Sequence, residues 1–134
     1  MSQENVEVAR EAFARFQAGD PAWSDWVHPD IEWDFSGNPL ADLPNRGRGR
    51  DALLKEVIET YFSGWIDYRG EITETVDAGD DVVVRLHERV RMRDSDAVLE
   101  RDMAHVWTVH NRQWVCWRIY ADWDSALEAV GLKE

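Results

Sequence analysis

The last quarter of the chain restricts the fold more than any other stretch. Residues 101–109 and 114–120 are rich in Val, Trp, Ile and Tyr, and the polar residues 110–113 separate them. Two such runs around a short polar segment predict two antiparallel strands joined by a hairpin. We expect this hairpin to form the centre of a sheet.

Strand alternation sorts the side chains of this hairpin onto two faces. In the first strand, His105 shares one side with three apolar residues: Met103, Trp107 and Val109. In the second, three polar residues share a face: Arg118, Tyr120 and Asp122. A half-apolar surface that carries a few ionisable groups is typical of a small-molecule pocket.

Length and composition restrict the class of protein. The 134 residues fit a single domain, spanning residues 1–134, that is long enough for a core and a ligand cavity. The formal net charge of −12 disfavours nucleic-acid binding, because an acidic surface repels a phosphate backbone. The single Cys116 excludes an internal disulfide, and the four histidines form no metal-binding pair, so we expect no metal. No glycine-rich nucleotide loop is present, and we expect no cofactor.

Nothing in the sequence predicts a membrane segment or an export signal. The N-terminus has no basic start followed by an apolar run, and no stretch approaches about 18 consecutive apolar residues. We therefore expect a cytoplasmic protein without membrane contact. Eight tryptophans supply much apolar area, and we expect some of them to line a cavity or a subunit contact.

The first half of the chain is mainly helical in its periodicity. We expect His28-Pro29-Asp30 to end the second helical piece, because Pro disfavours helix before it. The predicted elements are a helix over 5–18, a short helical piece over 23–27, a strand over 31–35, a long loop over 37–50 and a helix over 51–64.

Two further strands are predicted over residues 68–76 and 82–92, with a turn over 77–81. In the second of them Glu88 falls on the apolar side, which makes it a third carboxylate candidate, but we expect a bulge that lets it reach water. Helices before an antiparallel sheet indicate an α+β fold, with helices covering one face and the other free for solvent or a partner.

Six segments taken together resemble a known family. They are AREAFARFQAGD, HPDIEW, RGRGRDAL, VDAGDDVVV, AHVWTV and WRIYADWDSALEAVGL, in this order. This series is similar to the SnoaL-like branch of the superfamily of nuclear transport factor 2 and ketosteroid isomerase. The resemblance implies a cone of curved antiparallel sheet wrapped around N-terminal helices, with one deep apolar pocket and a homodimeric assembly.

The resemblance also implies roles for three residues. Asp34, in WDFSG, matches the position of the catalytic base of steroid isomerases. His105, in AHVWTV, matches the position of a protonated aspartic acid that donates to the substrate oxyanion, and a histidine could donate similarly. Asp122, in RIYADW, is similar to the acid or base of SnoaL-type cyclases. The predicted ligand-binding residues are Trp33, Phe35, Trp107, Arg118 and Tyr120.

The sequence also departs from the family pattern. Ala12 stands where steroid isomerases carry their main oxyanion donor, a tyrosine. The Asp-Arg-Asp trio of epoxide hydrolases is matched only loosely, by Arg85 or Arg118 with Asp34 and Asp122. These departures argue against steroid isomerisation as such and give the hydrolase less weight.

Each candidate residue also has a purely structural interpretation. Alternation can place Asp34 opposite Trp33 and Phe35, facing solvent. A histidine on an apolar strand face is often held by a neighbour for structural reasons. Asp122 with Arg118 can be a simple ion pair at a strand end.

Two functions follow from these patterns. The first is a cofactor-independent isomerase, cyclase or hydrolase that acts on a small apolar carbonyl compound by acid/base catalysis. The second is a non-catalytic, dimeric module that binds a small molecule, which the missing donor at Ala12 favours.

Overall fold

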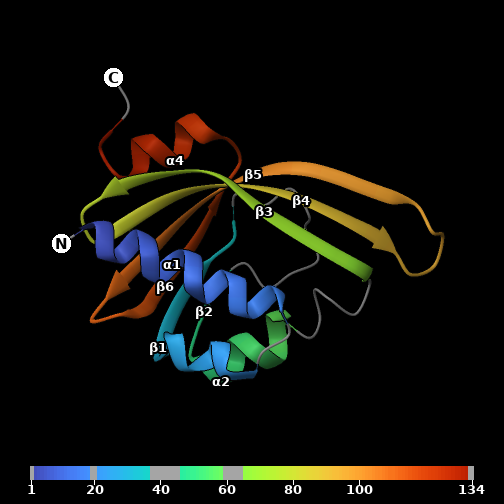
Figure 1. Cartoon of the computed structure of the whole chain (residues 1–134), viewed down its shortest axis with the longest axis horizontal. Coiled ribbons are helices and arrows are strands. Elements are labelled where there is room, and N and C mark those ends of the chain that lie inside the picture. The colour runs from blue at the N-terminus through green and yellow to red at the C-terminus, as the bar shows by residue number, and fades with distance from the viewer. Residues whose placement is uncertain (1, 19–20, 37–45, 59–64, 133–134) are drawn as a thin grey trace.

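The computed structural model is a mixed α+β fold built on one curved sheet, and it describes residues 2–18, 21–36, 46–58 and 65–132 (Figure 1). Its six strands lie in the order β2-β1-β6-β5-β4-β3. The predicted α+β class is therefore confirmed, as is the hairpin at the centre of the sheet, since β6 and β5 are its two middle strands.

The elements follow the chain in a simple order. The helical segments are α1 (Ser2–Gln17), the 3₁₀ helix η1 (Pro21–Trp26), α2 (Arg50–Ala52), the π-helix η2 (Leu53–Ile58) and α4 (Trp123–Ala129). The strands are β1 (Val27–Asp34), β2 (Arg46–Arg48), β3 (Trp65–Ala78), β4 (Asp81–Met92), β5 (Val98–His110) and β6 (Gln113–Tyr120). Neighbouring strands are antiparallel except β1 and β6, which run parallel.

The central hairpin turns in two residues. His110 pairs with Gln113, so Asn111 and Arg112 form the turn, and their φ angles are 51° and 63°. Positive φ at both positions is the type I′ geometry, whose twist matches that of the flanking strands. Asn tolerates this geometry well, whereas Arg at the second position is strained because its Cβ crowds the backbone.

α1 covers one side of the sheet, which we call the inner face (Figure 1). The main core lies between them, where Ala12 and Phe13 of α1 meet Trp107 of β5, and the rings of Phe13 and Trp107 lie 5.7 Å apart. Inner-face residues of β4 and β5 alternate as predicted. They are Val82, Val84, Leu86 and Glu88 in β4, and Met103, His105, Trp107 and Val109 in β5.

The opposite side, the outer face, is free only in part, whereas the sequence predicted it to be free. α4 packs there, and its buried Ala126 joins Val83, Ala104 and Val106 in a second apolar cluster. The C-terminal helix covers this face because the chain leaves β6 at Tyr120 and turns back over the outer side of β5 (Figure 1).

Two expectations for the first half were wrong in detail. His28-Pro29-Asp30 lies inside β1, not before it, because the β1–β6 register shifts between Val27 and Glu32 and such an irregularity accommodates a proline. Residues 46–48, expected in a loop, form β2 and pair with β1. Residues 37–45 of the expected loop and residues 59–64 of the expected helix lie outside the described residues.

No helix in the part of the chain that the structure describes is long and apolar enough to cross a membrane.

We expect Arg112→Gly to stabilise the protein. Glycine adopts the positive φ of this turn without the Cβ penalty, and we expect the free energy of unfolding in urea to rise by roughly 0.5–1 kcal/mol. Arg112→Ala is the control, because it removes the exposed contact of Arg112 with Glu4 but keeps the Cβ. A glycine variant no more stable than the alanine variant would show that the turn carries no strain.

Candidate functional site

His105 lies in the middle of β5 on the inner face and is only 2% exposed. Its Nδ1 accepts hydrogen bonds from the indole Nε1 of Trp107, at 3.1 Å, and of Trp117, at 3.0 Å. A ring nitrogen that accepts two N–H groups carries no proton, so the proton of the neutral imidazole lies on Nε2. This hydrogen-bond pattern therefore makes Nε2 a donor.

The Nε2 donor of His105 is buried and has no hydrogen-bond partner among the described residues. An unsatisfied buried donor costs about 1–3 kcal/mol, so it is a place where a ligand oxygen gains affinity. Burial, together with the positive charge of Arg101, lowers the pKa of His105 to about 3. At neutral pH the ring is therefore uncharged and donates through Nε2.

Three of the four aromatic residues predicted to bind ligand lie on the inner face. Trp107 is fully buried, and Trp33 and Phe35 are 3% and 2% exposed. The ring of Phe35 meets Trp117 edge to face at 4.9 Å. The Nε1 of Trp33 is a second buried N–H without a hydrogen-bond partner in the described part of the chain. The rings of Trp107 and Trp117 lie against His105, and Phe35 packs on Trp117, so aromatic side chains adjoin the imidazole.

Asp34 lies on the other side of the sheet. Across β1 and β6, Trp33 is opposite Trp117 and Asp34 is opposite Arg118, so the alternation turns Asp34 to the outer face. Its carboxylate accepts a hydrogen bond from the Ser36 backbone N–H at 3.0 Å and lies 3.4 Å from Arg46 Nε. Burial works to raise the pKa of Asp34, but the hydrogen bonds of Ser36 and the charge of Arg46 together lower it below the usual value.

Asp122 caps α4. Its carboxylate accepts the Ser125 backbone N–H at 2.7 Å, in the side-chain geometry of a helix N-cap. The residue is exposed and follows the end of β6, so it does not share a strand face with Arg118 and Tyr120 as predicted. The structure therefore does not bring Asp34, Asp122 and His105 together on one face.

Arg118 and Tyr120, also predicted to bind ligand, lie on the outer face. Arg118 Nη1 donates to the Tyr120 hydroxyl at 3.1 Å, and its Nη2 lies 3.6 Å from Asp81. Tyr120 packs against the cluster that α4 covers. These two residues and His105 face opposite sides of the sheet.

The inner face holds a polar cluster that the sequence analysis did not assign. Glu88, expected to reach water through a bulge, is 4% exposed and lies in a regular register between β4 and β5. It accepts hydrogen bonds from the Tyr68 hydroxyl at 2.7 Å and from Arg101 Nε at 3.0 Å. The signal available in the sequence was its place on the apolar side of β4.

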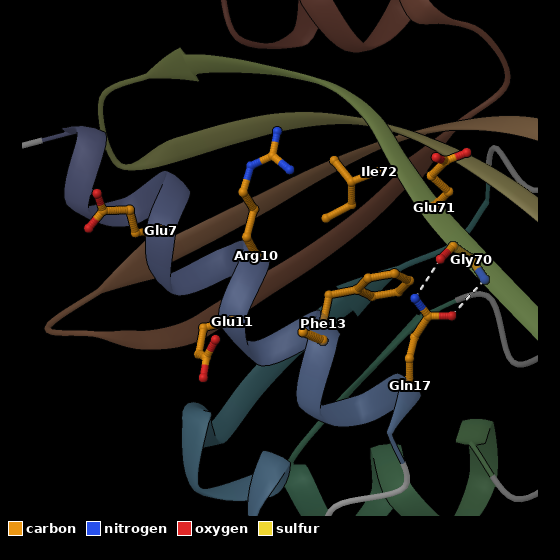
Figure 2. A pocket seen from close by; sticks show the side chains of 9 residues that line it. Glu7, Arg10, Glu11, Phe13, Gln17, Gly70, Glu71 and Ile72 are labelled. Atoms are coloured by element: carbon orange, nitrogen blue, oxygen red, sulfur yellow. Dashed lines mark hydrogen bonds between the residues drawn. The ribbon is translucent and has the colours of Figure 1, made fainter.

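A groove of about 540 Å³ runs along the surface between α1 and β3 (Figure 2). Phe13 and Ile72 provide its apolar part, and exposed polar side chains such as Glu7 line it. At one end, the Gln17 side chain makes two hydrogen bonds with the backbone of Gly70 (Figure 2). This groove is separate from the predicted pocket at His105, which stays a prediction.

Within residues 2–18, 21–36, 46–58 and 65–132, no group of three or more His, Cys, Asp or Glu side chains is placed to hold a metal ion. Cys116 is half-buried on β6, and burial raises the pKa of its thiol, which makes it a poor nucleophile.

Comparison with known proteins identifies the family of this chain. The profile of the SnoaL-like domain matches residues 9–117. No match is found among the curated proteins.

Several solved structures are similar over most of the chain. An NTF2-like protein from Burkholderia pseudomallei is 21% identical with a TM-score of 0.76, covering 95% of this chain and 97% of its own. A protein described as a SnoaL-like polyketide cyclase, from Mesorhizobium loti, is 18% identical with a TM-score of 0.58, covering 86% and 97%. An LEH-like epoxide hydrolase from M. tuberculosis is 15% identical with a TM-score of 0.70, covering 90% and 84%.

The pH dependence of stability tests the neutral state of His105. Its pKa is about 3 in the folded chain against an ordinary value of 6.5, so between these values only the unfolded chain takes up the proton. The free energy of unfolding therefore falls as the pH falls below about 6.5. From pH 7 to pH 5 we expect a loss of about 2 kcal/mol in urea denaturation, beyond the loss in His105→Gln.

Because both proteins contain the other titrating groups, the contributions of those groups to the pH dependence cancel when His105→Gln is compared with the unsubstituted protein. His87 acts in the opposite sense, because hydrogen bonds to Asp102 and Glu100 raise its pKa, but it is present in both proteins. Equal losses in the two proteins would contradict the assignment. So would a His105 ring that titrates between pH 8 and pH 5 in NMR spectra, a measurement that needs no variant to fold.

Proposed function

This chain belongs to the SnoaL-like domain family, and from that premise we propose that it binds a small apolar carbonyl compound on the inner face. The carbonyl oxygen accepts a hydrogen bond from His105 Nε2. This hydrogen bond polarises the carbonyl for a cofactor-independent isomerisation or cyclisation.

The observation that carries the proposal is the buried, partnerless Nε2 of His105. The indoles of Trp107 and Trp117 fix the ring, so the donor needs no reorientation when negative charge develops on the ligand oxygen. A neutral donor in an apolar setting accepts such charge better than a solvated one, because water does not screen it. The surrounding aromatic side chains favour an apolar ligand.

Proton transfer also needs a base. Asp34 and Asp122 keep their predicted roles as proposals, and nothing in the described geometry brings their carboxylates to the inner face. A non-catalytic binding module is therefore the second candidate. It is favoured by the contacts that hold the two carboxylates away from His105: Asp34 pairs with Arg46, and Asp122 caps the N-terminus of α4.

The names of similar proteins span the same range of functions. A protein described as a SnoaL-like polyketide cyclase and an LEH-like epoxide hydrolase are among the proteins of similar fold. A hydrolase would need a carboxylate to activate water, so it has less support here than a reaction that starts from a polarised carbonyl.

A homodimer and a cytoplasmic location also belong to the proposal. On the outer face, β4 and β5 carry exposed charged side chains of both signs, including Arg89, Arg91 and Asp102. Two copies of the chain can pair such charges. Light scattering that reports a single chain at micromolar concentration would contradict the dimer.

The exchange of ketone protons tests the catalytic proposal without knowledge of the natural substrate. We expect the protein to accelerate replacement of the α-protons of 4-phenyl-2-butanone by deuterium in D₂O, followed by NMR. In this proposal Asp34 or Asp122 takes the C–H proton, His105 donates to the enolate oxygen, and the carbon then takes a deuteron from solvent. His105→Leu should lower this rate about 100-fold, as loss of an oxyanion donor does.

Matched variants separate the alternatives. Val84→Ala, at the residue opposite His105 on β4, controls for lost packing, and His105→Gln, with an amide donor, should retain part of the rate. Asp34→Asn and Asp122→Asn test the predicted bases, and asparagine keeps the cap of α4. Tryptophan fluorescence that reports binding of 4-phenyl-2-butanone, without exchange above buffer, would replace the enzyme with the binding module.

A further inference from the structure

The cluster of Tyr68, Glu88 and Arg101 is the most buried ionic group that the structure describes on the inner face. One carboxylate oxygen of Glu88 lies 3.0 Å from Arg101 Nη2, and the other accepts the Tyr68 hydroxyl. The side chains of Glu88 and Arg101 are 6% and 16% exposed. The three residues come from β3, β4 and β5, and Glu88 is opposite Arg101 in the register.

The fold does not require charges at this place. Transfer of two charges from water into a protein interior costs several kcal/mol per ion, and apolar side chains of similar volume often stabilise a protein as well or better. The neighbouring inner-face positions of β4 are Leu86 and Val90, both buried and apolar. An ion pair here adds polar groups that a ligand can use.

The cluster lies on the same face as His105, farther along the same strand. Arg101 precedes His105 by four residues of β5, which is about 14 Å along a strand. Met103 lies between them on this face and is buried, and Leu86 is opposite it. The inner face therefore has a polar group at each end and an apolar surface between the two ends.

The groove between α1 and β3 ends beside this cluster. Gly70 lines the groove and is opposite Glu88 in the β3–β4 register. A Cβ at Gly70 would lie 2.7 Å from the Phe13 ring and 2.9 Å from the Tyr68 hydroxyl. The Phe13 ring and the Tyr68 hydroxyl therefore pack closely against the Gly70 backbone, in the space that a side chain at Gly70 would need.

We propose that Tyr68, Glu88 and Arg101 bind an uncharged hydroxyl group at the end of the ligand opposite its carbonyl. This inference rests on the proposed function, because it places the carbonyl at His105. The ligand is then an elongated hydroxy ketone with an apolar body.

The charges of the cluster select this chemical class. A hydroxyl group can donate to Glu88 and accept from Arg101, so it can form a hydrogen bond with each member of the pair. A carboxylate would face Glu88 at close range, and an amine would face Arg101, so each would be opposed by a like charge.

Four compounds distinguish the contribution of the carbonyl to binding from that of the hydroxyl: butylbenzene, 4-butylphenol, 4-phenyl-2-butanone and 4-(4-hydroxyphenyl)-2-butanone. With tryptophan fluorescence as the readout, we expect the phenol hydroxyl to lower the Kd of the ketone about tenfold. The double variant Glu88→Leu/Arg101→Leu, which removes both charges together, should bring this ratio to about one. Glu32→Gln/Arg48→Gln, at an exposed pair on β1 and β2, is the matched control and should keep the tenfold ratio.

The outcomes distinguish this inference from the proposed function. If 4-phenyl-2-butanone binds more tightly than butylbenzene but the hydroxyl adds nothing, the hydroxyl site is wrong and the carbonyl site stands. If neither ketone binds more tightly than its counterpart without the carbonyl, the proposed function fails. A test that needs no variant is 4-(4-carboxyphenyl)-2-butanone, which should bind at least about tenfold more weakly than the phenol; equal binding would overturn the proposal.

Discussion

Two indole N–H groups that share one acceptor determine how the inner face can act. Trp107 and Trp117 donate to Nδ1 of His105 from neighbouring strands, where they are opposite each other in the β5–β6 register. Their shared acceptor fixes the tautomer and the orientation of the ring, and burial keeps it uncharged. A histidine that would otherwise be a titrating group becomes a permanent hydrogen-bond donor through Nε2.

The positions of the carboxylates limit the reactions that His105 can support. Asp34 and Asp122 are held by other partners away from the inner face, whereas Glu88 lies on that face, paired with Arg101. This arrangement supports the binding and polarisation of a carbonyl by His105, but it does not identify the base. The ionic cluster around Glu88 adds a second polar end and favours a long ligand over a compact one.

Local patterns in the sequence predicted much of this structure. Alternation along residues 103–109 placed His105 with its apolar neighbours, and the polar residues 110–113 located the central turn, because both depend only on adjacent residues. The position of Asp34 could not be decided in the same way. It depends on which face of β1 meets α1, and that is set by the pairing of β1 with β6.

Other features depend on contacts between distant segments. Glu88 is buried because Tyr68 and Arg101, 20 and 13 residues away, reach it from the two neighbouring strands. α4 covers the outer face through Ala126, although its sequence shows only a short helix. No periodicity reports such pairings, so the polar cluster and the second apolar layer became visible only in three dimensions.

The most direct test of the central claim is the infrared spectrum of 4-phenyl-2-butanone, labelled with ¹³C at the carbonyl and bound to the protein. A carbonyl that accepts a hydrogen bond from His105 Nε2 absorbs at lower frequency than the same ketone in a hydrocarbon solvent, and this shift should disappear in His105→Leu. A hydrocarbon-like frequency in the unsubstituted protein, or a shift that persists in the variant, would contradict the assignment of His105 as the carbonyl donor.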